Sequence, residues 1–217
     1  MSREAIFPDL CIAATNVTLR GPNGPLFDPL SFRLHRGEIL CLVGPNGCGK
    51  SLLVRTIALG TTPKPFALGG LLSTPGCDAQ NAFYLPQLQA PEIHLPYCLG
   101  EIAALNAAGP CSFPWFEERM ARRSWNLASG GERMRALLAR ALATDSTLLI
   151  LDEPFNHLDA PTAEAVRASI QAETSGPRRR AFLLVSHAEE RADTENEDAG
   201  FPLLRLRRTR QEERNPT

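Results

Sequence analysis

The feature that most constrains this chain is a glycine-rich loop between an apolar run and an amphipathic segment. Residues 44–51 read Gly-Pro-Asn-Gly-Cys-Gly-Lys-Ser and fit the pattern G-x-x-x-x-G-K-[ST]. Residues 39–43 before them are apolar like a buried strand, and residues 52–59 after them have apolar side chains at helical spacing. In this setting, backbone N–H groups and a helix N-terminus converge on an anion. We therefore predict a nucleoside triphosphate site at this loop.

The loop's side chains have distinct expected roles. Lys50 would reach the β- and γ-phosphates, and the Ser51 hydroxyl would be a ligand of Mg²⁺. A chance match is the alternative, but Lys50 is one of only two lysines in the chain. The letters GPNG recur at residues 21–24 without a following G-K-S, and turn formation is sufficient there. The expected nucleotide contacts are Gly44, Pro45, Asn46, Gly47, Cys48, Gly49, Lys50, Ser51 and Leu52.

The bulk composition is that of a soluble globular protein. The chain has 217 residues, a 43% hydrophobic and 22% charged composition, and a net charge of −1. That charge gives no indication of nucleic-acid binding, so no nucleic-acid partner is expected. No apolar run reaches the length of a membrane span, and the N-terminus lacks a signal-peptide core. The scattered cysteines indicate reduced residues in a cytoplasmic protein and no metal site.

The order of patterns predicts an α/β fold with a mostly parallel sheet. Short apolar stretches over residues 10–43 predict an antiparallel meander that leads into the loop. Further along, strands are expected at 82–85, 147–151 and 181–185, and helices at 132–143 and 161–172. Prolines interrupt a helical stretch at about 88–128, which predicts a small helical insertion. The acidic stretch 189–198 and the basic stretch 205–214 are most simply solvated surface.

Two carboxylates, Asp152 and Glu153, follow the expected strand at 147–151. Ligands of parallel sheets bind at the carboxyl ends of strands, so Asp152 can hold Mg²⁺ opposite Ser51. Glu153 is then placed to polarise a water that attacks the γ-phosphate in line. A strand-ending turn with two surface acids is the alternative, and the phosphate loop makes it the weaker one.

Residues 129–132, Ser-Gly-Gly-Glu, open the helix predicted at 132–143. Ser129 and Glu132 have the spacing of a capping box, which alone explains the pattern. The bare Gly130 and Gly131 would also let the helix N-terminus approach a phosphate. A chain with one phosphate loop needs no second anion site for the same ligand. The economical interpretation is that residues 129–131 serve a nucleotide bound to another subunit.

Three further polar positions lie near the expected sheet edge. His187 ends the strand predicted at 181–185, although a lone histidine is more often structural than catalytic. Asp159 lies in an N-cap turn before the helix at 161–172. Gln87 follows the strand at 82–85 and could be any surface glutamine.

Taken in order, these segments resemble the ATP-binding-cassette (ABC) ATPase family from about residue 17 to residue 187. The matching motifs are the Walker A loop at 44–51, Gln87 of the Q-loop, the signature at 128–132 and Walker B at 148–152. They continue with Glu153, the D-loop Asn-His-Leu-Asp at 156–159 and the switch histidine His187. Six motifs in register, with Glu153 counted as part of Walker B, make a coincidence implausible.

The resemblance implies a P-loop NTPase core and ATP hydrolysis that depends on Mg²⁺. It further implies a head-to-tail dimer, identical or pseudo-symmetric, in which each ATP lies between one Walker A loop and the other signature helix. Glu153, His187 and Gln87 are the implied catalytic residues. Asp159 would act across the dimer interface, and Ser51, Gln87 and Asp152 would bind the metal.

The chain departs from the family pattern at three positions. The aromatic residue that usually stacks on adenine aligns with Arg20-Gly21, and Arg20 could stack there through its guanidinium plane. Ala128 replaces the usual leucine of the signature, and Leu52 stands where a threonine is common.

Two functions fit the resemblance. The first is the ATPase subunit of a transporter, peripheral on the cytosolic face of the membrane, that energises a permease formed by a separate chain. Residues 1–217 would then form one cassette with a charged tail at 205–217, similar in size to the haem-exporter ATPase of cytochrome c maturation. The alternative is a soluble ABC-F-like protein that acts on ribosomes, which Ser-Gly-Gly-Glu-Arg and Asp-Glu-Pro-Phe-Asn-His-Leu-Asp favour. ABC-F proteins carry two cassettes and a long charged linker, however, and this chain has one cassette.

Overall fold

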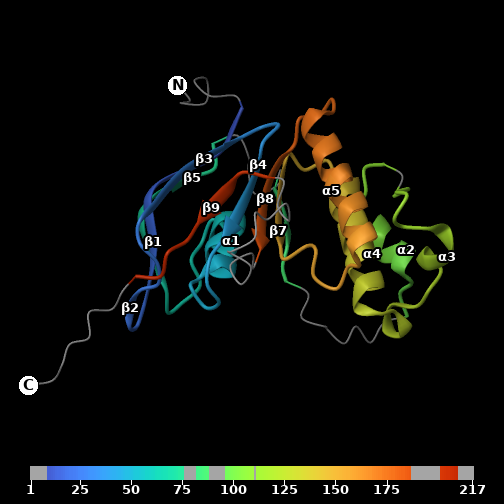
Figure 1. Cartoon of the computed structure of the whole chain (residues 1–217), viewed down its shortest axis with the longest axis horizontal. Coiled ribbons are helices and arrows are strands. Elements are labelled where there is room, and N and C mark those ends of the chain that lie inside the picture. The colour runs from blue at the N-terminus through green and yellow to red at the C-terminus, as the bar shows by residue number, and fades with distance from the viewer. Residues whose placement is uncertain (1–8, 76–81, 88–95, 110, 187–200, 210–217) are drawn as a thin grey trace, which may run out of the picture.

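A computed structural model describes residues 9–75, 82–87, 96–109, 111–186 and 201–209, which form two β-sheets with helices between and beside them (Figure 1). The first sheet is antiparallel, with the order β2-β1-β3 and β5 paired to β1. Its strands are β1 (Leu10–Gly21), β2 (Gly24–Pro25), β3 (Leu30–His35) and β5 (Ala67–Ser73).

Strand β1 is longer than the sequence predicts. The two apolar stretches expected at 11–14 and 17–19 merge into one strand, with a register shift between Ala14 and Val17. Asn16 adopts a φ of 50° inside this irregularity, and its N–H donates to Ser31 Oγ at 2.8 Å. Residues 15 and 16, which separate the two apolar stretches in the sequence, therefore form a β-bulge within one strand.

The second sheet is parallel and has the order β6-β7-β8-β4-β9. Its strands are β6 (Ala82–Leu85), β7 (Leu148–Asp152), β8 (Ala181–Ser186), β4 (Ile39–Val43) and β9 (Leu203–Arg205). The predicted α/β class with a mostly parallel sheet is confirmed. At the start of the basic stretch, Arg205, Arg207 and Arg208 are exposed, as predicted for solvated surface. Leu206 departs from this prediction because it is buried, and Arg205 ends a strand paired with β4.

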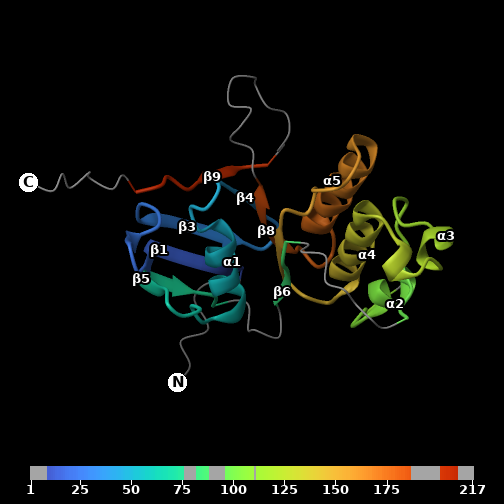
Figure 2. The same cartoon turned by 90° about the horizontal axis from the view of Figure 1, so that it is seen from below.

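Helices cover both faces of the parallel sheet (Figures 1 and 2). Helix α1 (Lys50–Leu59) packs between the two sheets, whereas α4 (Gly130–Ala143) and α5 (Ala160–Ser175) pack on the opposite face. Alternate residues of β7 pack into the hydrophobic cores on opposite faces of the parallel sheet. Leu148 joins the core beneath α1, and Leu149 joins the core beneath α4 and α5.

The described part of the helical stretch between β6 and α4, residues 96–109 and 111–129, contains short elements beside α4 (Figure 2). They are α2 (Leu99–Ala104), α3 (Glu118–Ala121) and the 3₁₀ turn η1 (Trp125–Leu127). Pro114 lies in the connection between α2 and α3, as expected of a residue that interrupts helices. The start of the predicted insertion, residues 88–95, lies outside the described residues, and its boundaries stay a prediction.

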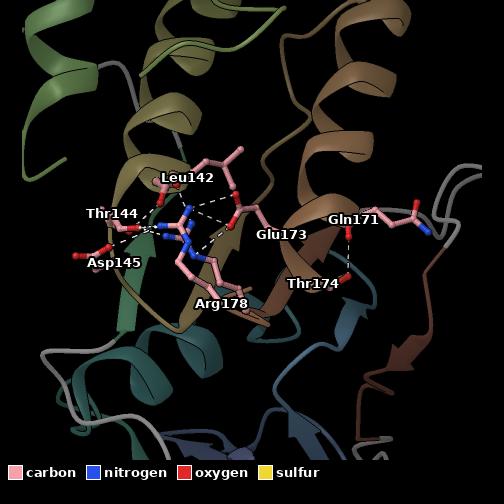
Figure 3. A network of polar contacts seen from close by, with 9 residues as sticks. Leu142, Thr144, Asp145, Gln171, Glu173, Thr174 and Arg178 are labelled. Atoms are coloured by element: carbon pink, nitrogen blue, oxygen red, sulfur yellow. Dashed lines mark hydrogen bonds and ion pairs between the residues drawn. The ribbon is translucent and has the colours of Figure 1, made fainter. Parts of the chain in front are cut away.

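A network of arginines ties the end of α4 to the segment that follows α5 (Figure 3). Arg178 donates to the backbone oxygen of Thr144 at 3.1 Å, and it pairs with Asp145 and Glu173. Arg180 is fully buried, donates to the backbone oxygens of Leu142 and Thr144, and lies 3.4 Å from Glu173. Burial lowers the pKa of Arg180, and Glu173 opposes this shift. These cations satisfy carbonyls at the helix C-terminus, where positive charge is favourable.

Candidate active site

Most of the predicted site residues lie where parallel strands end at one edge of the sheet. Val43 at the end of β4 pairs with Ser186 of β8, and Asp152 at the end of β7 pairs with Val185 of β8. Strand β6 ends on the same edge, two residues before Gln87. The topology therefore brings the phosphate loop, both carboxylates and Gln87 together, as predicted from the sequence.

The phosphate loop has the backbone that its glycines allow. Gly47 and Gly49 have φ values of 74° and 95°, in the left-handed region that side chains disfavour. Gly49 is the N-cap of α1 and supplies no side-chain hydrogen bond, so side chains do not cap the N-terminal N–H groups there. Lys50 is buried, and its Nζ donates to the backbone oxygens of Gly44 and Pro45, the latter at 3.0 Å. The ammonium group thus lies over the loop in which we expect the phosphates.

Two amides hold the carboxylate of Glu153. Glu153 is 4% exposed and has a φ of 55°, which is uncommon for a residue other than glycine. Its Oε2 accepts hydrogen bonds from Gln87 Nε2, at 2.8 Å, and from Asn156 Nδ2. Sequence reasoning placed Gln87 at the metal and the water and missed Asn156. The sequence signal for this contact is the spacing, since Asn156 lies only three residues after Glu153.

Two neighbouring cavities open at this sheet edge. One, of about 570 Å³, is lined by Lys50, Ser51, Gln87 and Glu153, together with Leu26, Asn46, Gly47, Gly49, Leu52 and Phe66. The other, of about 610 Å³, is lined by Ser51, Gln87 and Asp152, together with Leu52, Arg55, Leu59, Tyr84 and Pro86. Burial and the nearby Asp152 raise the pKa of Tyr84 to about 12, so the phenol is neutral. The proposed magnesium ligands Ser51, Gln87 and Asp152 thus share one cavity.

The oxygen donors of that cavity fit a magnesium ion. No group of three His, Cys, Asp or Glu side chains gathers within the part of the chain that the structure describes. The predicted ligands are instead a hydroxyl, an amide and one carboxylate. Mg²⁺ is commonly held by one or two carboxylates together with substrate phosphates, and it prefers oxygen ligands.

The predicted capping box at Ser129 is confirmed. Ser129 Oγ accepts from the Glu132 N–H, and the Glu132 carboxylate accepts from the Ser129 N–H at 2.8 Å. The hydrogen bond from the Ser129 backbone lowers the pKa of Glu132, and Arg123 adds to the shift. No residue of 129–132 is among the described residues that line the two cavities.

The D-loop covers the two glycines of the same helix start. A Cβ on Gly131 would lie 2.6 Å from the backbone oxygen of His157, and one on Gly130 would lie 3.4 Å from the His157 ring. His157 itself has a φ of 68°. The two glycines therefore let the D-loop pack closely on the start of α4. They also leave the helix N-terminus bare of side chains, as argued from the sequence.

Asp159 is not among the residues that line the two cavities. Asp159 is the N-cap of α5, as predicted, and accepts a hydrogen bond from the Thr162 N–H at 3.0 Å. The hydrogen bonds from Thr162 lower the pKa of Asp159. Its action across a dimer interface stays a prediction. His187 lies outside the described residues, and its catalytic role also stays a prediction.

Comparison with known families gives the same assignment. The family model "ABC transporter" matches residues 27–90 and 101–156, which is more than half of the chain and includes the loop at 44–51 and both carboxylates. The chain belongs to the ABC transporter family. Its described residues include no helix with both the length and the hydropathy of a membrane span.

Relatives from bacteria and a plant show the range of this similarity. The chain is 35% identical over 190 residues to the zinc import ATP-binding protein ZnuC of Paracoccus denitrificans, covering 83% of this chain and 70% of that protein. It is 33% identical to the hemin import ATP-binding protein HmuV of Nocardia farcinica, over 69% of this chain and 59% of that one. ABC transporter F family member 2 of Arabidopsis thaliana is 34% identical, but the match covers 67% of this chain and 22% of the plant protein.

Solved structures share the fold at low sequence identity. An ATP-binding subunit of an ABC transporter superposes with a TM-score of 0.67 at 20% identity, covering 90% of this chain and 85% of that one. A bacterial Atm1-family ABC exporter with ATP bound gives a TM-score of 0.65 at 20% identity, over 93% of this chain and 38% of that one. These likenesses support the predicted P-loop fold.

Proposed function

We propose that this chain is the ATP-hydrolysing subunit of a transporter and energises a permease formed by a separate chain. The observation that carries the proposal is the convergence at one sheet edge of Lys50 on its loop, Asp152, and Glu153 held by two amides. Such an arrangement suits phosphoryl transfer to water, in which catalysis consists mostly of positioning and charge stabilisation.

Different residues of the chain would bind the phosphates, hold the metal ion and accept the proton of the attacking water. The loop N–H groups and Lys50 bind and neutralise the phosphates, and Ser51, Asp152 and Gln87 would hold Mg²⁺. When bound, the ion supplies charge neutralisation at the β- and γ-phosphate oxygens. Glu153 accepts the proton of the attacking water, and the hydrogen bonds from Gln87 and Asn156 fix the orientation of its carboxylate.

A head-to-tail dimer would complete the site. Residues 129–131 begin a capped helix, yet they lie apart from both cavities around Lys50 and Asp152. A second cassette that presents its own Ser129, Gly130 and Gly131 would supply the missing wall of the nucleotide site. ATP binding would then close the dimer, and hydrolysis would open it.

The test of the enzymatic proposal is an ATPase assay on the purified chain with and without Mg²⁺. Lys50→Ala should reduce kcat/KM by about a hundredfold or more, because it removes the cation that binds the transferred phosphate. Lys64→Ala is the matched control, since it removes the chain's other, exposed lysine and should leave turnover unchanged. Equal activity of the two variants would contradict the proposal.

The permease and its cargo are the second part of the proposal. The chain should associate with the cytosolic face of the membrane through a polytopic protein. Relatives named for the import of zinc and hemin make metal-containing cargo the first class to test. Purification from detergent-solubilised membranes should recover the permease together with the chain.

An ABC-F-like role on ribosomes is the second candidate. The match to the plant F-family protein favours it, as do the strings at 129–133 and 152–159. Fractionation separates the two roles, since a transporter subunit sediments with membranes and an ABC-F-like protein with ribosomes. Recovery with ribosomes alone would replace the transporter proposal with this one.

A further inference from the structure

A side chain on Gly21 of β1 would press against an aromatic ring that packs beside this glycine. A Cβ on Gly21 would lie 3.1 and 3.3 Å from two ring carbons of Phe66. Phe66 directly precedes β5, whose Ala67 pairs with Arg20 of β1. A ring from the residue just before the neighbouring strand thus lies against the position at which the family pattern places an aromatic residue.

Phe66 also lines a third cavity, which adjoins the phosphate loop. This cavity has a volume of about 620 Å³ and is lined by residues 21–26 of the β1–β2 turn, Gly47, Phe66, Arg208 and Thr209. Leu26, Gly47 and Phe66 line the phosphate cavity as well, so the two spaces share a wall. A volume of this size lies within the range of small-molecule sites. Arg20 is not among the described residues that line either space.

The segment after β9 fixes the remaining side of this cavity. Leu206 N–H donates to the oxygen of Val43 at 2.8 Å, Asp28 N–H donates to the oxygen of Arg207 at 3.0 Å, and Arg208 forms a bridge with Phe27. Figures 1 and 2 show this segment running from the parallel sheet to the β1–β2 hairpin. Backbone pairing thus places Arg208 at the cavity's rim.

We propose that the cavity binds the base of the nucleotide, with Phe66 as the stacking platform and Arg208 as a donor to the base edge. The inference rests on the proposed nucleotide binding at the loop. An aromatic face stacks on any base, so Phe66 would add affinity without choosing between adenine and guanine. A guanidinium donates to N7, an acceptor that both purines present. The site would therefore prefer purine to pyrimidine triphosphates.

The experiment compares the binding of ATP, GTP, CTP and inorganic tripolyphosphate to the purified chain. Phe66→Ala should weaken ATP and GTP binding about tenfold and leave tripolyphosphate binding unchanged, because tripolyphosphate has no base. Phe66→Leu retains apolar volume without a π-face and should weaken ATP binding in the same direction. Leu71→Ala, an exposed change on β5, is the matched control and should alter neither affinity. Arg208→Ala should reduce the preference for ATP over CTP several-fold.

The outcomes separate this inference from the proposed function. ATP affinity that does not change in either Phe66 variant, or an equal loss for ATP and tripolyphosphate, would overturn the role of Phe66 while nucleotide binding stands. An unchanged ratio of ATP to CTP affinity in Arg208→Ala would overturn the role of Arg208. A wild-type chain that binds neither ATP nor tripolyphosphate would overturn both proposals.

Discussion

The side-chain amide of Gln87 donates a hydrogen bond of 2.8 Å to the carboxylate of Glu153, although 66 residues separate them in the sequence. Gln87 follows β6 and Glu153 follows β7, and these strands are neighbours in the parallel sheet. The hydrogen bond therefore links the proposed general base to the segment that leads into the helical insertion. A movement of that segment would shift the orientation of the carboxylate.

Substitution of Glu153 by Gln should abolish turnover and retain ATP. The change keeps the shape of the side chain but removes the base that accepts the water proton, so kcat should fall by roughly 10²–10⁴-fold. A dimer trapped by ATP should then be detected by size-exclusion chromatography. Glu164→Gln, an exposed acid on α5, is the control. Normal hydrolysis by the Glu153 variant would remove the role assigned to it.

Asn156→Ala should lower kcat about tenfold with little change in KM. The substitution removes one of the two amides on Glu153 Oε2, and hydrogen bonds to a charged group are among the stronger ones. Steady-state kinetics give the two parameters separately, and Asn126→Ala, an exposed asparagine, is the matched control. If KM rises while kcat stays constant, Asn156 acts on nucleotide binding and not on Glu153.

Gly131→Ala should destabilise the fold by about 1–3 kcal/mol. The new Cβ would lie 2.6 Å from the backbone oxygen of His157, so the D-loop or the start of α4 must move. Urea unfolding measures the loss. Gly109→Ala is the control, because a Cβ there meets no atom within 4 Å. An equal free energy of unfolding for the two variants would show that the D-loop does not pack closely on Gly131.

Arg180→Met should cost about 3 kcal/mol of the free energy of unfolding. It leaves the carbonyl of Leu142 without its arginine donor and removes one of the two arginine donors to Thr144. It also breaks an ion pair in which Arg180 is buried and Glu173 is 24% exposed. Arg178→Met should cost about 1 kcal/mol or less, because the Arg178 side chain is 43% exposed. Chemical denaturation of both variants tests which substitution costs more free energy of unfolding. A larger loss for Arg178→Met than for Arg180→Met would contradict the prediction.

The capping box of α4 should weaken at acidic pH. The pKa of Glu132 lies below its ordinary value of 4.5 in the folded chain, so its carboxylate stabilises the fold fully above pH 4.5. This contribution is lost as the pH falls through the lowered pKa. The wild type should therefore exceed Glu132→Gln in stability at about pH 7, and the difference should shrink as the pH falls below 4.5 and through the lowered pKa. A difference that stays constant over this range would exclude the charge as its source.

Local patterns predicted those parts of the site that depend on neighbouring residues. The strand, loop and helix around Lys50 were predicted from residues 39–59, and so were the carboxylates after β7. The capping box at Ser129 and the N-cap at Asp159 were predicted as well. Each of these features depends on a hydrogen bond or a backbone preference within a few residues, so its signal is contiguous in the sequence.

Distant pairings escaped the sequence analysis. Strand β9 has only three residues, and its pairing with β4 is what identifies it as a strand. No local pattern relates Phe66 to the site, and the pairing of β5 with β1 brings its ring against Gly21. Asn156 was assigned to a turn, although its amide reaches Glu153. For β9 and Phe66 the partner is chosen by the packing of whole strands and not by local preference. The hydrogen bond of Asn156 is local, since Glu153 lies only three residues before it.

The sequence by itself determined the α/β class, the phosphate loop and the carboxylates, because glycine backbone freedom, apolar periodicity and capping act over short range. Only the tertiary structure decided that Gln87 reaches Glu153, that His157 covers Gly131, and that Phe66 and Arg208 flank the phosphate loop. Those contacts join residues far apart in the chain or depend on side-chain packing. They exist because the parallel sheet aligns its strand ends at one edge and the antiparallel sheet places β5 beside β1.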